Sequence, residues 1–410
     1  MMLHLLKLVW QRKSHHLLLS LEILLAFMVV FALCATAGHY YQLFHMPTGL
    51  NHESRWQIMI EGQKMEELNQ NPPAQPASSE RTTTTVQPLM AQFQRALKQI
   101  PSVQQVGFSD MLLYDLSNQN NTLQRADNSQ SLDVNVIAVS DDFFQSVGLS
   151  LTAGRGFNAT DNGAAHQPVV IDQRLADTLF PDVDPIGQLL RYDDDSSTES
   201  FQIVGLVSAL RTQGELMGLA PTVITRLPEQ SLPTILLLQL TAGTDRAIEQ
   251  QLLQQLKQVR SDWRYNIQPL TQKRQSMLRT QMIPLMILAV LSAFLLSMVA
   301  FGLFGVLWQH TSQRIPELGL RRAIGATAGN IYWQIIAEQL LLNLLAVSVA
   351  LFLLVQLPLT GVLGEHLNWP LFLMASLVAT LIICLLSLVC ALYPAWRASR
   401  LTPTEALHYE

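Results

Sequence analysis

Four long apolar runs constrain this chain more than any other feature of its sequence. They cover residues 17–37, 282–308, 335–357 and 371–392. At about 1.5 Å of rise per helical residue, each run is long enough to cross a hydrocarbon layer about 30 Å thick. Charged residues make up only 14% of the 410 residues, against about 25% in a typical soluble protein. The sequence therefore predicts an α-helical membrane protein with four transmembrane helices.

The basic residues predict how these helices are oriented. The short segments 1–16, 309–334 and 393–410 contain Lys or Arg, whereas 358–370 contains neither. Short loops rich in Lys and Arg stay on the cytoplasmic side of a membrane. We therefore expect these three segments in the cytoplasm and 358–370 outside it. Residues 38–281 are also expected outside, because long domains are translocated largely regardless of their charge.

The first apolar run could be a signal peptide or a membrane helix. Ala35-Thr36-Ala37 resembles a cleavage site, but the run exceeds the roughly 7–15 apolar residues of a secretory signal. We therefore expect an uncleaved helix.

Glu22 lies within this helix, where a central charge costs about 2.5–3.5 kcal/mol. Because Glu22 is nearer the cytoplasmic end, we expect its side chain to reach the membrane surface in preference to making a helix–helix contact.

The segment between the first two spans combines helix and strand patterns, which is typical of a large α+β extracytoplasmic domain. Residues 69–85 are rich in Pro, Ser and Thr and predict a linker or long loop. Ser140 is expected to cap a short helix that Gly148 ends. Apolar spacing predicts helices at 88–100, 141–147 and 248–259, and strands at 103–108, 134–139, 201–207, 234–240 and 265–268. Residues 51–68 and 270–281 are expected to form a pair of stalk helices.

A short polar and basic stretch, Ser312 to Thr327, separates the second and third runs. Pro316 and Glu317 suit a first helical turn, and Gly325 suits a left-handed helix end. Ile315, Leu318 and Ala323 can form an apolar stripe, and Thr327 is expected to cap the third span. The stretch predicts either a short helix on the membrane surface or an ordinary cytoplasmic loop.

Four motifs resemble those of the MacB/FtsX-type ABC transporter permease family. The residues Glu317 to Ala326 are similar to its "EIG-RRA-GA" signature, and Pro394 to Leu407 to its C-terminal "PA-RA…P-EAL". Gly154-Arg155-Gly156-Phe157 with Asp161, and Phe180-Pro181 followed by Asp184-Pro185-Ile186-Gly187, resemble two elements of its periplasmic domain. Pro316 departs from the family pattern, which has a polar or basic residue there.

The resemblance implies a permease in the bacterial inner membrane, whose periplasmic domain carries an inserted lobe. It also implies a short coupling helix that contacts a separate cytoplasmic ABC ATPase subunit, with ATP and Mg bound by that ATPase. The expected contact residues are Glu317, Gly319, Arg321, Arg322 and Gly325. Four spans are few for a pore, so we expect a dimer with a second copy or a paralogue. An adaptor and an outer-membrane channel are further candidate partners, in addition to membrane lipid.

The sequence gives little support for a catalytic, cofactor or metal site on this chain. It contains no G-x-x-x-x-G-K-[ST] loop and no G-x-S-x-G elbow. The spacing of His39, His45 and His52 matches no compact chelating pattern. Asp193-Asp194-Asp195 is expected to be a solvated turn. The net charge of −5 argues against a nucleic-acid partner, which would require a basic surface.

Two functions are compatible with these features. The first is export or efflux of a peptide, lipoprotein or small molecule, driven by ATP hydrolysis on the partner subunit. The alternative is a transmembrane signalling scaffold that activates an extracytoplasmic enzyme. The size of the 38–281 domain and its "GR-F…dPiG" elements favour the first.

The predicted topology can be tested with single cysteines at Ser197, Ser312 and Thr360 in a Cys-free background. We expect an impermeant thiol reagent to label Ser197→Cys and Thr360→Cys from outside, and Ser312→Cys only after the membrane is opened. The protein should keep an N-terminal tag, because the first span is expected to be uncleaved. Labelling of Ser312→Cys from outside would contradict both the topology and the coupling helix.

Overall fold

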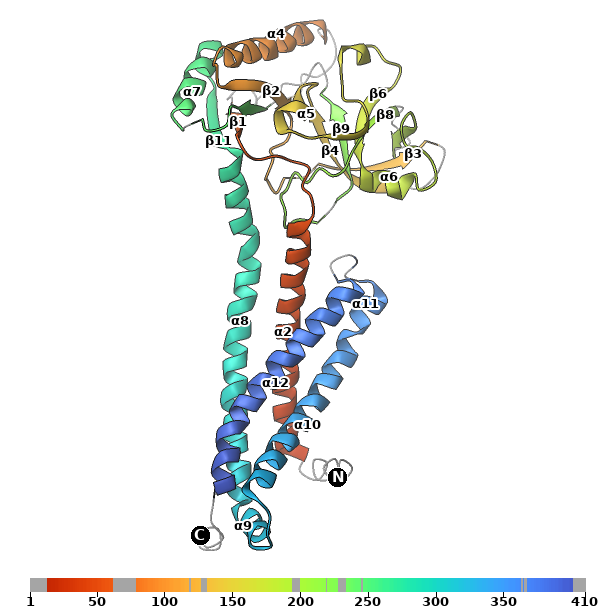
Figure 1. Cartoon of the computed structure of the whole chain (residues 1–410). Helices are drawn as coiled ribbons and strands as arrows, with labels where there is room; N and C mark the ends of the chain where they lie inside the picture. The colour runs from red at the N-terminus through yellow and green to blue at the C-terminus, as the bar shows by residue number, and fades with distance from the viewer. Residues whose placement is uncertain are drawn as a thin grey trace. The chain divides into compact units, whose positions relative to one another are not determined.

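The chain contains two compact units (Figure 1). The computed structural model describes residues 13–61, 79–117, 119–126, 131–193, 200–218, 220–227, 234–244, 246–362, 364 and 367–400. The helical unit comprises Met1–Gln42 and Met282–Glu410, and the inserted domain comprises Leu43–Gln281. Several predicted features lie wholly or partly outside the described residues: the start of the 1–16 segment, most of the 69–85 linker, Asp194, Asp195, Ser197 and the motif residues beyond Arg400.

Four helices of the helical unit are long and apolar enough to cross a membrane. They are α2 (Lys13–His45), α8 (Leu270–Gln313), α10 (Ala328–Leu354) and α12 (Trp369–Arg400). Each predicted run lies largely or wholly within one of them. Two short helices accompany them, α9 (Ile315–Ala323) and α11 (Gln356–Thr360). The predicted fold class, four apolar helices with a large domain between the first and second, is confirmed.

Small side chains hold the helical unit together. Ala346 and Ala350 of α10, with Ala375 and Ala379 of α12, are all buried in its core. Small residues let helix backbones approach closely, which matters in lipid because burial of apolar groups there gives no hydrophobic gain. On the outer surface, large apolar side chains such as Phe301 and Phe352 are 79% and 70% exposed. This apolar exterior is suited to contact with lipid.

Glu22 lies at a contact between α2 and α8. A Cβ atom added to Gly302 of α8 would lie 2.8 and 3.1 Å from the two carboxylate oxygens of Glu22. Glycine at this position therefore makes room for the carboxylate. The sequence favoured a side chain that reaches the membrane surface, but the structure places Glu22 in the helix–helix contact, the reading that the sequence ranked second.

The inserted domain is built on one sheet of eleven strands, and part of this sheet closes on itself. The main order is β11-β1-β10-β2-β4-β3-β7-β8-β6-β9, with β5 paired to β8 and an additional parallel pairing of β4 with β9. That last pairing closes β4, β3, β7, β8, β6 and β9 into a ring. The domain therefore has two lobes, an open four-stranded sheet and a closed six-stranded ring.

The open lobe is formed by the two ends of the domain's sequence. Its strands are β1 (Arg55–Glu61), β2 (Val103–Ser109), β10 (Ile235–Leu240) and β11 (Arg264–Pro269). Helices α4 (Ser79–Lys98) and α7 (Ile248–Val259) pack against the sheet with Phe93, Leu97, Leu252 and Leu256 (Figure 1).

The stalk helix expected at 51–68 is wrong, because residues 55–61 form the strand β1. Trp56, Ile58 and Ile60 alternate with Gln57, Met59 and Glu61, and the first three are buried. This period of two is the pattern of a strand with one face in the core. β1 pairs with β10 on one side and with β11 on the other.

The ring lobe comes from the middle of the domain's sequence, as an inserted lobe should. Its strands are β3 (Asn120–Arg125), β4 (Ser131–Val139), β6 (Gln167–Asp172), β7 (Leu189–Tyr192), β8 (Ser200–Val207) and β9 (Thr222–Arg226). β5 (Leu151–Gly154) lies beside β8. Helix α6 (Gln173–Leu179) begins where Asp172 accepts a hydrogen bond from the Leu175 N–H.

For the short helix α5 (Phe143–Val147), the predicted N-cap is wrong and the predicted C-terminal glycine is confirmed. Its N-cap is Asp142, which makes no side-chain capping bond. The Ser140 hydroxyl instead accepts a hydrogen bond from the Phe108 N–H at 2.9 Å, so that it joins β2 to the turn before α5. Gly148 ends the helix in the left-handed region, at φ 68°, as predicted.

Candidate functional site

The short helix α9 is the first candidate site, and the sequence predicted its boundaries well. It follows α8 almost directly and contains Glu317 in its first turn. The chain leaves it through Gly325 at φ +107°, a conformation that favours glycine. Thr327 then caps α10 by accepting a hydrogen bond from the Asn330 N–H. The predicted short helix is therefore confirmed, and its position on the membrane surface stays a prediction.

One face of α9 packs against the helical unit. Leu318 is 7% exposed and contacts Ile331 of α10 and Ala398 of α12. Ile315 is buried to the same extent. Ala323, the third member of the predicted stripe, is exposed. The helix is thus anchored by its first turns, and its C-terminal end is free of the core.

A chain of polar contacts joins α9 to α10. Arg314 pairs with Glu338 at 2.9 Å, and Glu338 accepts a hydrogen bond from Gln334 at 3.0 Å. Arg321 donates to Gln334 at 3.0 Å and to Glu317 at 2.6 Å. The Arg321–Glu317 pair is about half exposed, so its own contribution to stability is small, about 0–1 kcal/mol. Together the contacts orient α9 relative to α10.

The five predicted contact residues therefore have different surroundings. Glu317 and Arg321 contact each other and α10, and Gly325 forms the turn. Gly319 and Arg322 lie on α9, but their side-chain surroundings are outside the described part of the structure. The sequence analysis overlooked Leu320 and Ile324, which are 58% and 79% exposed. Leu320 lies in α9 and Ile324 directly follows it, and their i, i+4 spacing was the available signal.

The second candidate site is a joint within the inserted domain, centred on Arg211. This side chain is 5% exposed and donates to three backbone carbonyls. It contacts Leu43 O, in the last turn of α2, at 2.8 Å, as well as Glu215 O and Met217 O. A cation near a helix C-terminus is favoured by the helix dipole. Arg211 thus fixes the end of α2 to the 208–221 loop.

The same loop holds the first turns of α8. The Glu215 carboxylate pairs with Arg274, and the Gln281 side chain donates to Gln213 O at 3.1 Å. Burial lowers the pKa of Arg211, but the carbonyl contacts supply partners for its charge. Gly49 is required beside this loop, since its φ is +75° and a Cβ would lie 1.8 Å from Ala209 O. The segment that enters the domain and the segment that leaves it therefore contact the same loop.

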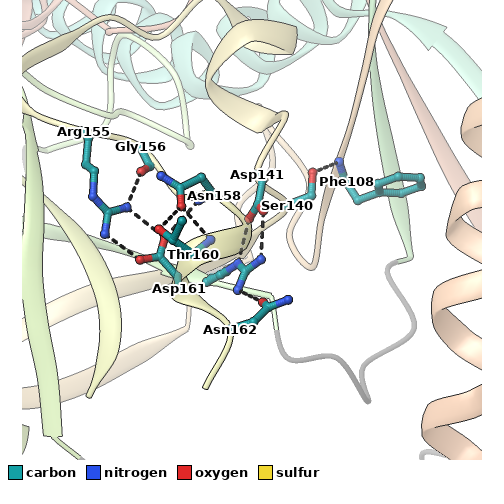
Figure 2. A network of polar contacts seen from close by, with 10 residues as sticks. Phe108, Ser140, Asp141, Arg155, Gly156, Asn158, Thr160, Asp161 and Asn162 are labelled. Carbon is teal, nitrogen blue, oxygen red and sulfur yellow. Dashed lines mark hydrogen bonds and ion pairs between the residues drawn. The ribbon is translucent and has the colours of Figure 1, made fainter. Parts of the chain in front are cut away.

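A third polar network stabilises the turn that contains Gly154-Arg155-Gly156-Phe157 (Figure 2). Arg155 makes two bonds to the Asp161 carboxylate, at 2.6 and 2.9 Å. Asp161 also accepts from the Asn158 N–H at 2.9 Å, which completes a capping box on the short 3-10 helix Ala159–Asp161. Nearby, Arg226 pairs with Asp141 at 2.7 Å. These contacts stabilise the turn and the adjoining part of the domain.

The remaining motif of the domain is also a turn. Asp184 accepts a hydrogen bond from the Ile186 N–H at 3.0 Å, and Gly187 has a φ of +87°. Phe180 is buried, and the Arg125 guanidinium lies 5.0 Å from its ring centre. Within the described residues, no group of three or more His, Cys, Asp or Glu side chains is arranged to hold a metal ion.

Two family models cover most of the chain. The MacB-like periplasmic core domain matches residues 23–256, and the FtsX-like permease C-terminal model matches residues 289–403. The chain belongs to the MacB/FtsX-type ABC transporter permease family. The first model contains the Gly154 and Phe180 motifs of this permease, and the second contains α9 and the end of α12.

Curated relatives agree with this assignment. The macrolide export ATP-binding/permease protein MacB of Sodalis glossinidius (strain morsitans) is 26% identical over 304 residues, which are 69% of this chain and 44% of that protein. The protein of the same name from Syntrophobacter fumaroxidans is 31% identical over 176 residues, or 42% of this chain and 24% of that one. The permease therefore spans less than half of these relatives, whose names combine ATP-binding and permease functions.

Among solved structures, the periplasmic region of MacB from Actinobacillus actinomycetemcomitans is similar to 58% of this chain. The likeness covers 97% of that structure, with 15% identity and a TM-score of 0.37. A domain of a putative permease protein from Porphyromonas gingivalis is similar to 53% of the chain, with a TM-score of 0.35.

We expect Arg211→Gln to loosen the joint. The variant leaves buried carbonyls short of a charged donor, and each hydrogen bond to a charged group is worth about 1.5–3 kcal/mol. Hydrogen exchange should accelerate at least tenfold at residues 43–50 and 208–221, and less in the ring lobe. Arg191→Gln, which removes an exposed arginine of the same domain, is the control. Unchanged exchange at residues 43–50 would contradict the joint.

Asp161 should make the stability of the inserted domain dependent on pH. The hydrogen bonds from Arg155 hold the pKa of Asp161 below its ordinary value. The ion pair therefore stabilises the folded domain above the unfolded pKa of about 3.9, and this stabilisation is lost as pH falls through the lower folded pKa.

At neutral pH, Asp161→Asn should lower the free energy of unfolding by about 1.5–3 kcal/mol, and the difference from the wild type should disappear in acid. Asp262→Asn is the matched control, because its pair with Arg260 is exposed and should be worth at most about 1 kcal/mol. Denaturant titrations at several pH values measure both. Equal losses in the two variants would show that burial adds nothing to the Asp161 pair.

Proposed function

We propose that this permease is the membrane-spanning subunit of an exporter that couples ATP hydrolysis on a separate ATPase subunit to movements of the inserted domain. The observation that carries the proposal is the outward face of α9. Leu320 of α9 and Ile324, which directly follows α9, are large, apolar and exposed, while Leu318 on the opposite face of the helix is packed and Glu317 is paired with Arg321. A pair of this kind is suited to a pocket on another protein.

The proposal places α9 on the cytoplasmic side, where an ATPase would bind ATP and Mg. Support comes from the basic residues of the 309–334 segment. The localisation that follows is the bacterial inner membrane, with residues 38–281 in the periplasm.

The contacts of α9 indicate which helices would move if α9 were displaced. Leu318 joins α9 to both α10 and α12, and Arg314 joins it to α10 through Glu338. Displacement of α9 by closing ATPase subunits would therefore shift α10 and α12 together.

The class of cargo is a further part of the proposal. Proteins similar to this chain are named for macrolide export, which supports a small molecule as cargo. We propose export of a small molecule, peptide or lipoprotein by a dimer of permease chains. An adaptor and an outer-membrane channel would complete the route in a cell with two membranes. The signalling alternative has no observation in its favour here.

We expect the double variant Leu320→Asp/Ile324→Asp to lose the ATPase. Burying one such side chain is worth about 1.5–3 kcal/mol, so the loss of both should weaken binding by at least about a hundredfold. Co-purification of the ATPase and ATP turnover in the reconstituted complex measure the effect. Leu359→Asp/Val362→Asp is the matched control, because these side chains are 67% and 77% exposed in and just after α11. Equal binding by both variants would refute α9 as the contact.

The arginines of α9 provide a second test. Arg321→Glu/Arg322→Glu should reduce the yield of co-purified ATPase, because it reverses two charges of α9, one of which is paired with Glu317. A wild-type yield together with unchanged ATP turnover would remove these arginines from the proposed contact.

A further inference from the structure

Four aromatic rings are stacked on the surface of the helical unit, where α8 and α12 lie together. Phe304 and Trp308 of α8 lie 6.2 Å apart, and each stacks on Tyr393 of α12, at 6.2 and 5.9 Å. Tyr393 in turn stacks on Trp396 at 6.3 Å. Phe304, Tyr393 and Trp396 are 40%, 51% and 47% exposed. The stack therefore faces the surroundings of the helical unit.

Two arginines of α12 extend this stack. The Arg397 guanidinium carbon lies 4.4 Å from the ring centre of Trp308, and that of Arg400 lies 4.6 Å from the ring centre of Trp396. Both side chains are exposed. We call the four rings and the two arginines the aromatic–arginine cluster.

The arginines have no carboxylate partner among the residues that the structure describes. A cation–π contact uses the flat face of a guanidinium, while its five N–H groups lie in the plane and point outward. These donors match the geometry of phosphate oxygens, which arginine binds in a bidentate manner. The cluster thus presents the N–H groups of two oriented guanidinium groups to an anion. Among the described residues, no carboxylate pairs with either group.

The position of the cluster favours a lipid as the source of that anion. It lies at the ends of two helices that are apolar enough to span a membrane, beside a small hollow lined by Thr311, Ser312 and Arg397. Aromatic rings are enriched where acyl chains meet headgroups, and basic pockets between spanning helices bind anionic headgroups. A carboxylate on a protein partner would gain little from the exposed rings.

We propose that the aromatic–arginine cluster is a binding site for an anionic phospholipid. Arg397 and Arg400 bind the headgroup phosphate, and the stacked rings contact the upper part of the acyl chains. The hollow beside them also touches Ile315, the first residue of α9. A bound lipid would therefore brace α8 and α12 next to α9, which the proposed function does not require.

The first test measures which lipid the full chain retains. The purified protein is equilibrated with mixed phosphatidylglycerol and phosphatidylcholine, and the retained lipids are counted by native mass spectrometry. An arginine near a membrane surface favours anionic lipid about fivefold, so two should give an enrichment of about 25-fold. Equal retention of the two lipids would overturn the proposal and leave the arginines to a protein partner or to solvent.

Variants test whether Arg397 and Arg400 cause this enrichment. Arg397→Gln/Arg400→Gln should abolish the enrichment, and Arg397→Lys/Arg400→Lys should keep only part of it, because lysine has the charge without the planar fork. Arg191→Gln/Arg264→Gln changes the net charge equally in the inserted domain and should retain the wild-type enrichment. A preference that survives Arg397→Gln/Arg400→Gln would overturn the site, and full retention by the lysine variant would overturn bidentate binding.

A second measurement keeps both arginines intact. Trp369 and Trp396 lie at opposite ends of α12 and are 46% and 47% exposed, and only Trp396 has arginines beside it. In chains that retain one or the other as their sole tryptophan, with Trp308→Phe so that a ring remains beneath Arg397, we compare quenching by two lipids with brominated acyl chains. These are phosphatidylglycerol and phosphatidylcholine, each as a minor component of phosphatidylcholine vesicles. Trp396 should be quenched several-fold more by the anionic lipid and Trp369 equally by both. Equal quenching of Trp396 would refute the proposal.

Discussion

The lack of water in a hydrocarbon layer is the constraint on which the structure of the helical unit depends. Every backbone N–H and C=O at that depth must find a partner within the chain, so the four apolar runs form helices. Burial of apolar side chains gives no gain there, and cohesion must come from close packing. The alanines of α10 and α12 provide this, together with the hydrogen bond from buried Asn343 to Ile383 O at 3.3 Å. The large apolar side chains are left for the outside.

In the inserted domain, by contrast, burial of apolar side chains away from water stabilises the core. One apolar cluster lies under α4 and α7, a second belongs to the six-stranded ring, and a third combines residues of both lobes, such as Leu237 of β10 and Ile224 of β9. The ring leaves fewer free edges than an open sheet, which lowers the risk of edge-to-edge association. The buried groups Asp161 and Arg211 have charged or carbonyl partners. Asp161 lies at a turn, and Arg211 lies at the joint.

The three arginine sites illustrate how one side chain serves different purposes in this permease. Arg155 is paired with a carboxylate and stabilises a turn, and Arg211 is paired with carbonyls and fixes a helix end. Arg397 lies over an aromatic ring and leaves its N–H groups to the surroundings. Among the residues that the structure describes, the third arrangement has no hydrogen-bond acceptor for the guanidinium, whereas Arg155 and Arg211 each have several. A binding role follows from the partners that a charge lacks, which composition and spacing do not reveal.

The sequence by itself determined the elements whose signal is local. Long apolar runs, the period-3.6 stripe of 248–259, the glycines at 148 and 325 and the Thr327 cap are each decided within a few residues, and each was found. The four family motifs also identified the permease family. The short strands β3, β5, β6, β7 and β9 were missed because few residues carry their pattern and their pairing partners are far away in sequence.

Only the tertiary structure decided the contacts between distant segments. The strand β1 was mistaken for a helix because its stability comes from β10 and β11, which lie far along the chain. The Arg211 joint brings together Leu43, Glu215 and Arg274, and the aromatic–arginine cluster joins α8 to α12. No spacing rule links such residues. Their proximity arises from the packing of whole elements, which depends on all the side chains of a core at once.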